Sequence, residues 1–563
     1  MEVPRIIHDE LLHGLEEPRE EALKHAVEAL EHGAHVLESP VTKTAELASK
    51  APSESTPLLM AGTHIVAVDD DLDLRVLAIK LSEEERVVIE EDAKTPAKTI
   101  VKEELVHLLT MSPPLMLALL MEQIPDTISN MMAGRTDAIR STEILAAFSL
   151  AGLFQALVVT PFVYGVASAM DTVCSQAYGG KRYREMWMFV QAGSIMFAAC
   201  LPFIALIMAD GKPILVALGQ DSVISTTTQD INLITLIALP FQAIFTIQKS
   251  ALQAQNIVSP FAISALAAWA ISLPTGYILG FYTPLGYTGV VISTIVLSVL
   301  KAVFLFPVVW RNPIFREHWP GWRLREAFQL LPKIMHLGVS SVLMVTFQMI
   351  GFTVISLLAG LLPNPAITMS ANSIFGSALS LTLMPLLGVC VAGAIRMGNA
   401  LGSGQAHRAA VMAHVTVVSC VVVSTLITVS IILGAERFAH LFTTNVEAVT
   451  ESLKLLYRLT PIIFMLGFVF GLQSIFRACG KQWLCAQLNF VFMFLLAVPL
   501  GIFFAMDLNE GVIGLWYGFG IGMLALIGSS SVWFARMRWE DMAQAARRTT
   551  QLHVEEPRAA EAF

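Results

Sequence analysis

Long apolar runs separated by short polar connections fill most of this chain from about residue 110 onward. A helix needs roughly 20 predominantly apolar residues to cross the hydrocarbon core of a membrane, and each run reaches that length. The pattern therefore predicts an all-α, polytopic membrane protein with twelve transmembrane helices. We expect these helices near residues 111–133, 145–169, 187–209, 230–249, 259–281, 287–309, 333–359, 368–391, 409–433, 456–474, 483–505 and 512–534.

The composition supports the same class of protein. Of the 563 residues, 55% are hydrophobic and 14% are charged, whereas soluble domains carry about 25% charged residues. Residues 1–104 hold 24 Asp and Glu against 11 Lys and Arg. We therefore expect residues 1–104 to form an acidic, largely disordered cytoplasmic tail. An acidic tail on a mildly basic membrane body argues against nucleic-acid binding.

Basic residues predict the orientation of the spans, because Lys and Arg concentrate in cytoplasmic connections. With both ends of the chain in the cytoplasm, the inner connections hold more basic residues than the outer ones, which agrees with an even number of spans. The inner set is Lys181, Arg182, Arg184, Lys249, Arg311, Arg316, Arg323, Arg325, Arg396, Arg408, Arg477, Lys481, Arg536, Arg538, Arg547 and Arg548.

A repeat relates the two halves of the membrane region. The stretch "QAYGG" (176–180) matches "NALGS" (399–403), and "SALQAQ" (250–255) matches "SIFRAC" (474–479), at nearly the same shift along the chain. Further along, "GYTGVV" (286–291) matches "GVIGLW" (511–516) at a shift that is almost unchanged. Matches in one order at nearly one shift indicate an internal duplication.

The duplication predicts two six-helix lobes around a central cavity, with a substrate site at their interface. We expect an N-lobe at residues 105–310, a cytoplasmic linker at 311–331 and a C-lobe at 332–535. A cytoplasmic C-terminal tail at 536–563 completes the chain, which we expect to act as a monomer surrounded by membrane lipid.

A polar cluster closes the second span of each half. Its residues are Asp171, Gln176, Gly179 and Gly180 in the N-lobe and Arg396, Asn399, Gly402 and Gly404 in the C-lobe. We expect the glycines to permit turns with positive φ and a close backbone approach. Gln176 and Asn399 suit capping of backbone carbonyls, and we assign Asp171 to structural capping near the end of its helix. A phosphate-binding loop at "GGKR" is excluded, because no strand precedes it.

Glu122 and Asp126 are the acidic pair that we find inside a predicted span. They are four residues apart and therefore share one helix face, with Ser129 near the same stripe. A carboxylate at membrane depth costs roughly 2.5–3.5 kcal/mol on insertion scales. We interpret Glu122, Asp126 and Ser129 as candidates for ion coupling; the alternative is a structural role near the outer surface.

Neutral polar residues also fall within or beside the predicted spans. They either line the cavity as hydrogen-bonding groups or satisfy contacts between helices, and the sequence leaves both interpretations open. These candidates for substrate contact are Asn130, Gln155, Gln242, Gln348, Thr353 and Gln473. No metal site or cofactor is expected, because the six cysteines show no spacing typical of metal ligands.

Several motifs carry a resemblance to a known family. "MDTVCSQAYGGKRYREM" and "RMGNALGSGQAHRA" resemble the signatures that follow helices 2 and 8 of the multidrug and toxic compound extrusion (MATE) transporters of eukaryotic type. "LQAQNIVSP" and "IFRACGKQ" are similar to the family after helices 4 and 10. The resemblance implies a secondary active antiporter, and not an enzyme, that exports organic cations or amphipathic solutes in exchange for H⁺ or Na⁺.

The resemblance also implies carboxylates in helices 7 and 10, and this chain departs from it there. The corresponding positions are Gln348, Thr353 and Leu466, none of which is acidic. This departure keeps an alternative open, namely an uncoupled facilitator or a lipid-linked flippase of related architecture.

The segment "ESTPLL" has an acidic residue, Glu54, four positions before the pair Leu58 and Leu59. It is similar to acidic dileucine sorting signals, which adaptor complexes read. The similarity favours a vacuolar or lysosome-like membrane, with the plasma membrane as the alternative.

Overall fold

The computed structural model describes residues 58–61, 64–67 and 85–550, apart from 138, 218, 360–361, 363–364 and 441–445. It contains two compact units, residues 1–83 and 84–563. In the first unit, strands β1 (Leu58–Ala61) and β2 (His64–Ala67) form an antiparallel pair in which Leu58 lies opposite Ala67. The regular secondary structure among the described residues of the second unit consists of helices.

Two lobes and a few additional helices make up the second unit. A helix at residues 85–94 precedes the N-lobe, α14 (Pro313–His318) connects the lobes, and α23 (Trp539–Thr550) follows the C-lobe. The N-lobe contains α5 (Ala97–Ala133), α6 (Ser141–Val158), α7 (Thr160–Gly179), α8 (Tyr183–Ala209), α9 (Gly211–Ala217), α10 (Ser222–Leu236), α11 (Leu239–Ala254), α12 (Ser259–Phe281) and α13 (Tyr287–Arg311). The C-lobe contains α15 (Leu324–Ala359), α16 (Pro365–Gly402), α17 (Ala406–His440), α18 (Val446–Arg458), α19 (Thr460–Ala478), α20 (Gln482–Asn489), the π-helical η1 (Phe490–Leu496), α21 (Ala497–Ile502), η2 (Phe503–Asp507) and α22 (Gly511–Arg536).

The predicted fold class is confirmed. In the described part of the chain, eleven helical segments are long and apolar enough to cross a membrane, and the bent pair α10–α11 makes twelve. The spans expected at 259–281 and 287–309 agree closely with α12 and α13. The span expected at 145–169 extends to 141–179 and consists of α6 and α7, which meet at Val159 just before Pro161.

The boundary expected between the acidic tail and the N-lobe at residue 104 lies inside α5. Residues 85–94 and 97–104 are helical, and acidic side chains of this segment contact the lobes. The acidic composition predicted a disordered tail because negative side chains without partners stay solvated. Here Asp92 and Glu104 are buried against partners from a distant part of the chain.

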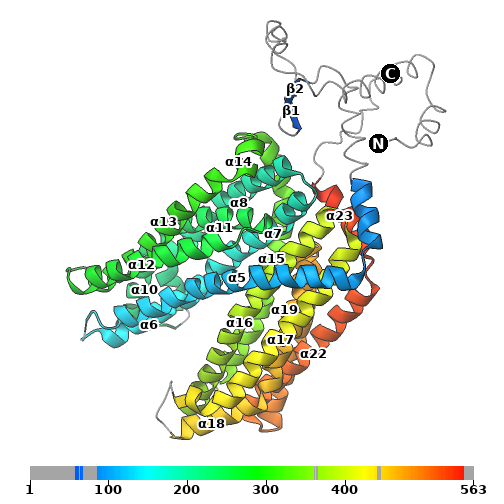
Figure 1. Ribbon diagram of the computed structural model, residues 1–563. Helices are drawn as coiled ribbons and strands as arrows, with labels where there is room; N and C mark the ends of the chain where they lie inside the picture. Colours follow the sequence, from blue (N-terminus) through cyan, green and yellow to red (C-terminus); the bar gives the residue numbers. More distant parts are fainter. Residues whose placement is uncertain are drawn as a thin grey trace, which may run out of the picture. The chain divides into compact units, whose positions relative to one another are not determined.

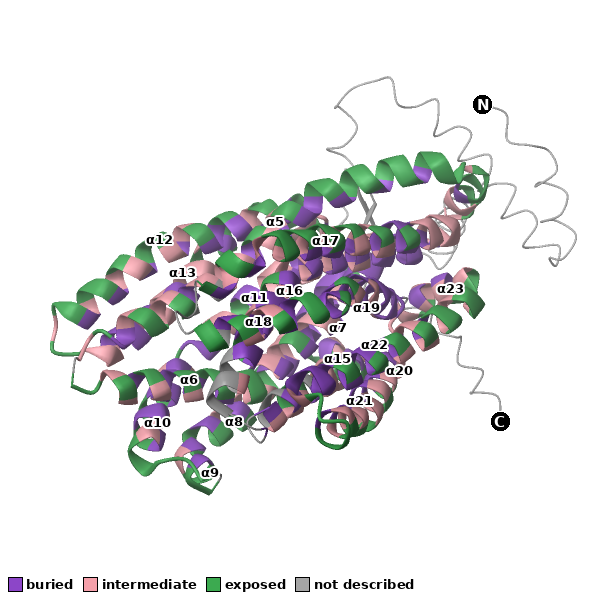
Figure 2. Ribbon diagram, turned by 90° about the horizontal axis from the view of Figure 1, so that it is seen from below, coloured by how far each residue is buried: buried purple, intermediate pink, exposed green. Residues whose placement is uncertain are grey.

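Within residues 84–563, the two lobes meet at the end that carries α14 and α23 and diverge toward α12 and α18 (Figure 1). We call the end where they meet the closed end. Helix α7 of the N-lobe packs against α15 and α16 of the C-lobe. The inner helices α7, α11, α16 and α19 carry many buried residues, whereas α12 and the first part of α5 expose much of their surface (Figure 2).

The linker and the last helix are both anchored at the closed end. In the linker, Gln191 of α8 donates to the Gly321 carbonyl at 2.7 Å and accepts from the Arg323 N–H at 2.9 Å. Trp187 stacks edge-on against Phe315 and Trp319. Helix α23 buries Ala543, Ala546 and Thr550 and contacts α7, α16 and α17, so it touches both lobes.

Candidate functional site

Glu122 of α5 and Lys249 of α11 form an ion pair in the N-lobe, with 3.3 Å between Lys249 Nζ and Glu122 Oε1. The two side chains are 29% and 18% exposed, so the pair is largely withdrawn from the surface. Lys249 also lies 6.0 Å from the ring centre of Phe261. On α13, Lys301 lies 5.0 Å from the ring centre of Phe245 and adds to the positive charge near Glu122.

The structure corrects the expected place of Lys249. From the sequence we assigned it to an inner connection, because Lys near the end of a span is typical of the membrane interface. It lies instead within α11, five residues before the helix ends, and its charge is paired with Glu122. Glu122 is 127 residues from Lys249 in the sequence, so only the structure identifies it as the partner of Lys249.

Of the other coupling candidates, the structure describes the side chain of Ser129 alone. The side chain of Asp126 lies outside the described residues. Ser129 lines a cavity of about 10 Å³ inside the N-lobe, together with Trp269 of α12 and Ser293 of α13. Asn130 is exposed.

The neutral candidates fall into different surroundings. Gln155 donates to Asn232 Oδ1 at 3.4 Å, which ties α6 to α10. Gln242 and Gln348 are half-buried, and Thr353 is exposed with its hydroxyl donating to the Met349 carbonyl. Gln473 is 2% exposed, and neither end of its amide has a hydrogen-bond partner among the described residues.

Asp171 lies at the interface of the lobes and not at a helix end. It is eight residues before the end of α7, so the capping role that we expected is wrong. With Ser168 and Thr172 it lines a cavity of about 20 Å³ that Arg477 of α19 completes. Asp171 Oδ1 and Arg477 Nε are both buried without a hydrogen-bond partner among the described residues. Arg477 was not a sequence candidate, although it lies in the repeated "SIFRAC" stretch.

The two polar clusters form signature turns, residues 176–182 and 399–405, that pack against each other backbone to backbone. A Cβ atom at Gly179 would overlap the Asn399 carbonyl, and a Cβ atom at Gly402 would overlap the Gln176 carbonyl. The contact is reciprocal, because each turn uses a glycine to admit the carbonyl of the other. The close approach expected of these glycines therefore joins the two lobes.

The expectation of positive φ is wrong for Gly179, Gly180 and Gly402. Left-handed backbone occurs in the turns at Lys181, with φ 56°, and at Gly404, with φ 82°. Glycine is needed at 179 and 402 for space and not for backbone conformation. Left-handed residues nevertheless recur at the repeat spacing in both lobes: Lys181 and Gly404, Asn256 and Gly480, Gly286 and Gly511.

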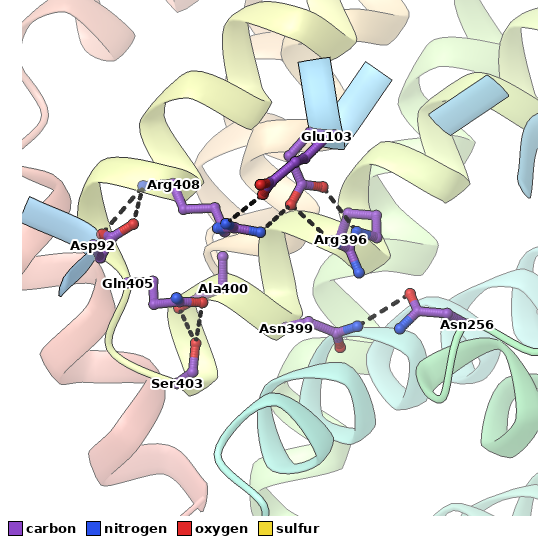
Figure 3. A network of polar contacts seen from close by, with 10 residues as sticks. Asp92, Glu103, Asn256, Arg396, Asn399, Ala400, Ser403, Gln405 and Arg408 are labelled. Atoms are coloured by element: carbon purple, nitrogen blue, oxygen red, sulfur yellow. Dashed lines mark hydrogen bonds and ion pairs between the residues drawn. The ribbon is translucent and has the colours of Figure 1, made fainter. Parts of the chain in front are cut away.

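The amides of the turns also reach across to the opposite lobe. Gln176 of α7 donates to the Ala478 carbonyl at the end of α19, at 2.8 Å. Asn399 Nδ2 lies 3.1 Å from Asn256 Oδ1 (Figure 3). When the side-chain oxygen and nitrogen of Asn399 exchange places, its Nδ2 donates to the carbonyl of Ala254 at the end of α11, at 3.2 Å. Ala254 and Ala478 are separated by the repeat spacing, so the two contacts are symmetric equivalents.

Acidic residues of segment 85–104, which we call the strap, bind the arginines beside the turns. The Glu104 carboxylate accepts from Arg396 at 2.7 and 2.9 Å and from Arg408 at 3.0 Å. Asp92 accepts from the backbone N–H groups of His407 and Arg408 at 2.9 and 3.1 Å, which caps the start of α17. This is the favourable place for a carboxylate, because a helix N-terminus is partly positive.

A second arm of the strap reaches the N-lobe turn. Glu85 pairs with Arg182 at 3.1 Å and also with Arg547 of α23. Arg182 donates in turn to the Thr550 hydroxyl at 2.6 Å and to the Arg547 carbonyl at 3.1 Å. Burial lowers the pKa of Arg182 and the Glu85 charge opposes this effect, but a guanidinium stays protonated in proteins.

The sorting candidate lies only partly in the described residues. Glu54 lies outside them, and Leu58 and Leu59 are the first two residues of β1. A strand is extended, so the two leucines are in an extended segment of chain.

Comparison with known proteins gives one family. The model of the family named MatE matches residues 114–278 and again residues 340–503. Multidrug and toxin extrusion protein 1 of Oryctolagus cuniculus is 26% identical over 456 residues, which cover 80% of this chain and 78% of that protein. Protein DETOXIFICATION 16 of Arabidopsis thaliana is 29% identical over 443 residues, which cover 76% of this chain and 89% of that protein.

Solved structures share the fold. The crystal structure of the eukaryotic MATE transporter AtDTX14 matches with a TM-score of 0.74 and 22% identity, covering 80% of this chain and 100% of that one. The starts of the two MatE matches, Pro114 and Ser340, are separated by the repeat spacing to within a few residues, and so are their ends. This spacing confirms the internal duplication that the sequence predicts.

Proposed function

This chain belongs to the MatE family of transporters, and on that premise we propose that it exports organic solutes across a membrane by alternating access. The relatives are named for multidrug and toxin extrusion, so the solutes are organic cations or other amphipathic compounds. The path runs between the two lobes, which diverge away from the closed end (Figure 1). A transporter role of this kind needs no catalytic residue.

We propose that H⁺ is the coupling ion, with Na⁺ as the alternative, and that Glu122 binds it. The observation that carries this proposal is the ion pair between Glu122 and Lys249. An ion pair between helices that cross a membrane is costly to bury unless its two charges are matched and hydrogen-bonded. Protonation of Glu122 would remove the negative member and leave Lys249 with a charge that favours a different arrangement of α5 and α11.

The order of events follows from the competition between H⁺ and Lys249 for the Glu122 carboxylate. A proton that enters from the diverging end neutralises Glu122 while solute leaves on the same side. The lobes then rearrange, and the proton departs from the other side as Lys249 pairs with Glu122 again. The cycle exchanges one solute for inward proton movement, and it uses the N-lobe as the coupling lobe.

Sealed vesicles that contain the purified protein and a fluorescent organic cation test the proposal. We expect efflux to follow an imposed ΔpH and to ignore an imposed Na⁺ gradient. Glu122→Gln should abolish ΔpH-driven efflux because it removes the proposed proton site, and Asp126→Asn on the same helix should also abolish it, with expression unchanged. Asp210→Asn is the control, because Asp210 is exposed at the end of α8. Undiminished ΔpH-driven efflux by the double variant would place the coupling site elsewhere.

A second candidate function is uncoupled transport, as a facilitator or a lipid-linked flippase. It is favoured by Gln348, Thr353 and Leu466, which stand where the family resemblance implies carboxylates. Solute movement that ignores both the proton and the Na⁺ gradient in the same vesicles would select this alternative.

We further propose that Glu54, Leu58 and Leu59 direct the protein to a vacuolar or lysosome-like membrane through adaptor complexes. The extended backbone of β1 at the two leucines suits recognition of a short linear segment. Replacing Leu58 and Leu59 by Ala should move a tagged protein from an internal acidic membrane to the cell surface. The control is Ile65→Ala with Val66→Ala in β2, and unchanged localisation of the leucine variant would refute the signal.

A further inference from the structure

Glu104 joins parts of the molecule that belong to different lobes. It lies in α5, which continues into the N-lobe and packs its later residue Met132 near Gly276 of α12. Its carboxylate, however, is bound by Arg396 of α16 and Arg408 of α17, both in the C-lobe. The side chain is 1% exposed, so no solvent competes for these contacts at the closed end.

We propose that Glu104 is a lock between the lobes: it holds the closed end together and must release Arg396 and Arg408 whenever that end opens. The inference uses the two-lobe transporter architecture and does not depend on which ion drives transport. Glu104 touches neither solute nor coupling ion in this scheme. It acts through the two arginines, so it is a positioning residue for the transport cycle.

The chemistry of the contact suits a lock of this kind. Arg396 binds both carboxylate oxygens in the forked geometry that gives strong, oriented pairs. Removing one partner of a buried ion pair leaves the others without compensation, which is far more costly than losing an exposed pair. The lock therefore stabilises the closed arrangement relative to any arrangement in which α5 and the C-lobe turn separate.

The second arm of the strap acts in the same direction. Glu85 binds Arg182 of the N-lobe turn and Arg547 of α23, and α23 also packs on the C-lobe helices α16 and α17. Glu85 is 28% exposed, so this arm is weaker than the contact at Glu104. Both arms are made at the closed end, where the signature turns interlock.

The neighbouring acid supplies a matched control. Glu103 is on the same helix, carries the same charge and pairs with the same Arg408 at 2.8 Å, but it is 47% exposed and does not contact Arg396. A general effect of charge on the strap would appear in Glu103→Gln and Glu104→Gln alike. A lock at Glu104 would appear only in the second.

Spin labels on both lobes measure the effect without transport. Arg184→Cys at the start of α8 and Lys481→Cys before α20 place labels at exposed positions of the two lobes. The six native cysteines are replaced, and pulsed electron paramagnetic resonance in lipid nanodiscs records the distance distribution with no solute and no gradient. We expect Glu104→Gln to shift the ratio of open to closed conformers about 5- to 150-fold toward the open form, the range of typical coupling effects. Glu103→Gln should shift it less than about twofold.

Two outcomes would overturn the lock. Equal distributions in Glu104→Gln and the parent would show that the first part of α5 travels with the C-lobe, and equal shifts in both Gln variants would show a general charge effect. If Glu104→Gln does not fold, Glu85→Gln carries the test, with an expected shift of about two- to fivefold in the same direction and no shift as the contradiction. Loss of proton coupling in vesicles would leave these distributions unchanged, so the two proposals fail separately.

Discussion

The N-lobe and the C-lobe share a backbone plan but differ in charge. Left-handed residues, helix-end amides and the interlocking glycines recur in both lobes at the repeat spacing. The position of Lys249, by contrast, corresponds at the same spacing to Gln473. Lys249 is paired with Glu122, whereas Gln473 is buried with no hydrogen-bond partner among the described residues.

The difference separates two tasks that a duplicated transporter must perform. Geometry at the closed end is needed from both lobes, because each signature turn is the packing partner of the other. Under the proposed function, charge for ion coupling is needed from only one lobe, and the N-lobe holds the charged pair Glu122 and Lys249. Mutations at equivalent positions should therefore have equal effects at the closed end and unequal effects at the pair of positions 249 and 473.

We expect the largest loss of transport and stability at the closed end, where the two lobes are alike. Gly179→Val and Gly402→Val each place side-chain atoms on a backbone carbonyl of the opposite turn, which cannot be relieved by a rotamer change. Each variant should lose nearly all transport and more than about 3 kcal/mol of stability. Uptake in vesicles and chemical denaturation in bicelles measure the two quantities.

Matched controls exist in each lobe. A Cβ atom added at Gly152 of α6 or at Gly434 of α17 would have no neighbouring atom within 4 Å, so Val at these sites meets open space. Gly152→Val and Gly434→Val should therefore fold and transport normally. Full transport by Gly179→Val or Gly402→Val, or a strong effect in only one of the two, would break the equivalence of the turns.

A smaller but asymmetric effect is expected at the charged pair. Lys249→Gln makes the N-lobe resemble the C-lobe at this position and leaves Glu122 largely buried without its partner. We expect a loss of about 3 kcal/mol in the free energy of unfolding together with loss of ΔpH-driven efflux.

The double variant Glu122→Gln with Lys249→Gln sharpens that result. Replacing both charges by neutral groups removes the cost of an unpaired ion, so stability should return to within about 1 kcal/mol of the parent. Coupling should not return, because no proton site is restored. Recovery of ΔpH-driven efflux in the double variant would show that the pair is structural.

Features with a local signal were predictable from the sequence. Helix α12 begins at Ser259 next to Pro260 and ends before a turn, so both boundaries are visible in the chain. The repeat was predictable because the turns need glycine and helix-end amides in both lobes. The identity of the packing partner was not, because nothing local states that Gly179 meets the Asn399 carbonyl.

Charged contacts were the least predictable part of the site. Lys249 and Glu122 are 127 residues apart, and Glu104 is 292 residues from Arg396. Counting acidic residues assigned Glu104 to a disordered tail, and counting basic residues assigned Lys249 to a connection. Both counts treat a charge as solvated, whereas these charges are withdrawn from solvent because a partner from a distant segment compensates them.

We expect the smallest change in the free energy of unfolding at Gln473. Whether replacing Gln473 raises the stability or leaves it unchanged distinguishes two interpretations of the C-lobe. A buried amide without a partner carries a desolvation cost of about 1–3 kcal/mol, and Gln473 is 2% exposed in a tightly packed part of α19. If it is enclosed within the lobe, Gln473→Met, which keeps the length and removes the polar atoms, should stabilise the protein by about 1 kcal/mol and leave ΔpH-driven efflux unchanged. If Gln473 instead contacts solute in another stage of the cycle, the same variant should raise the KM for the organic cation without any gain in stability. Bicelle denaturation and initial efflux rates over a range of solute concentrations separate these outcomes. A raised KM would make the C-lobe a binding lobe beside a coupling N-lobe, because a neutral amide can bind solute but cannot carry a proton near neutral pH.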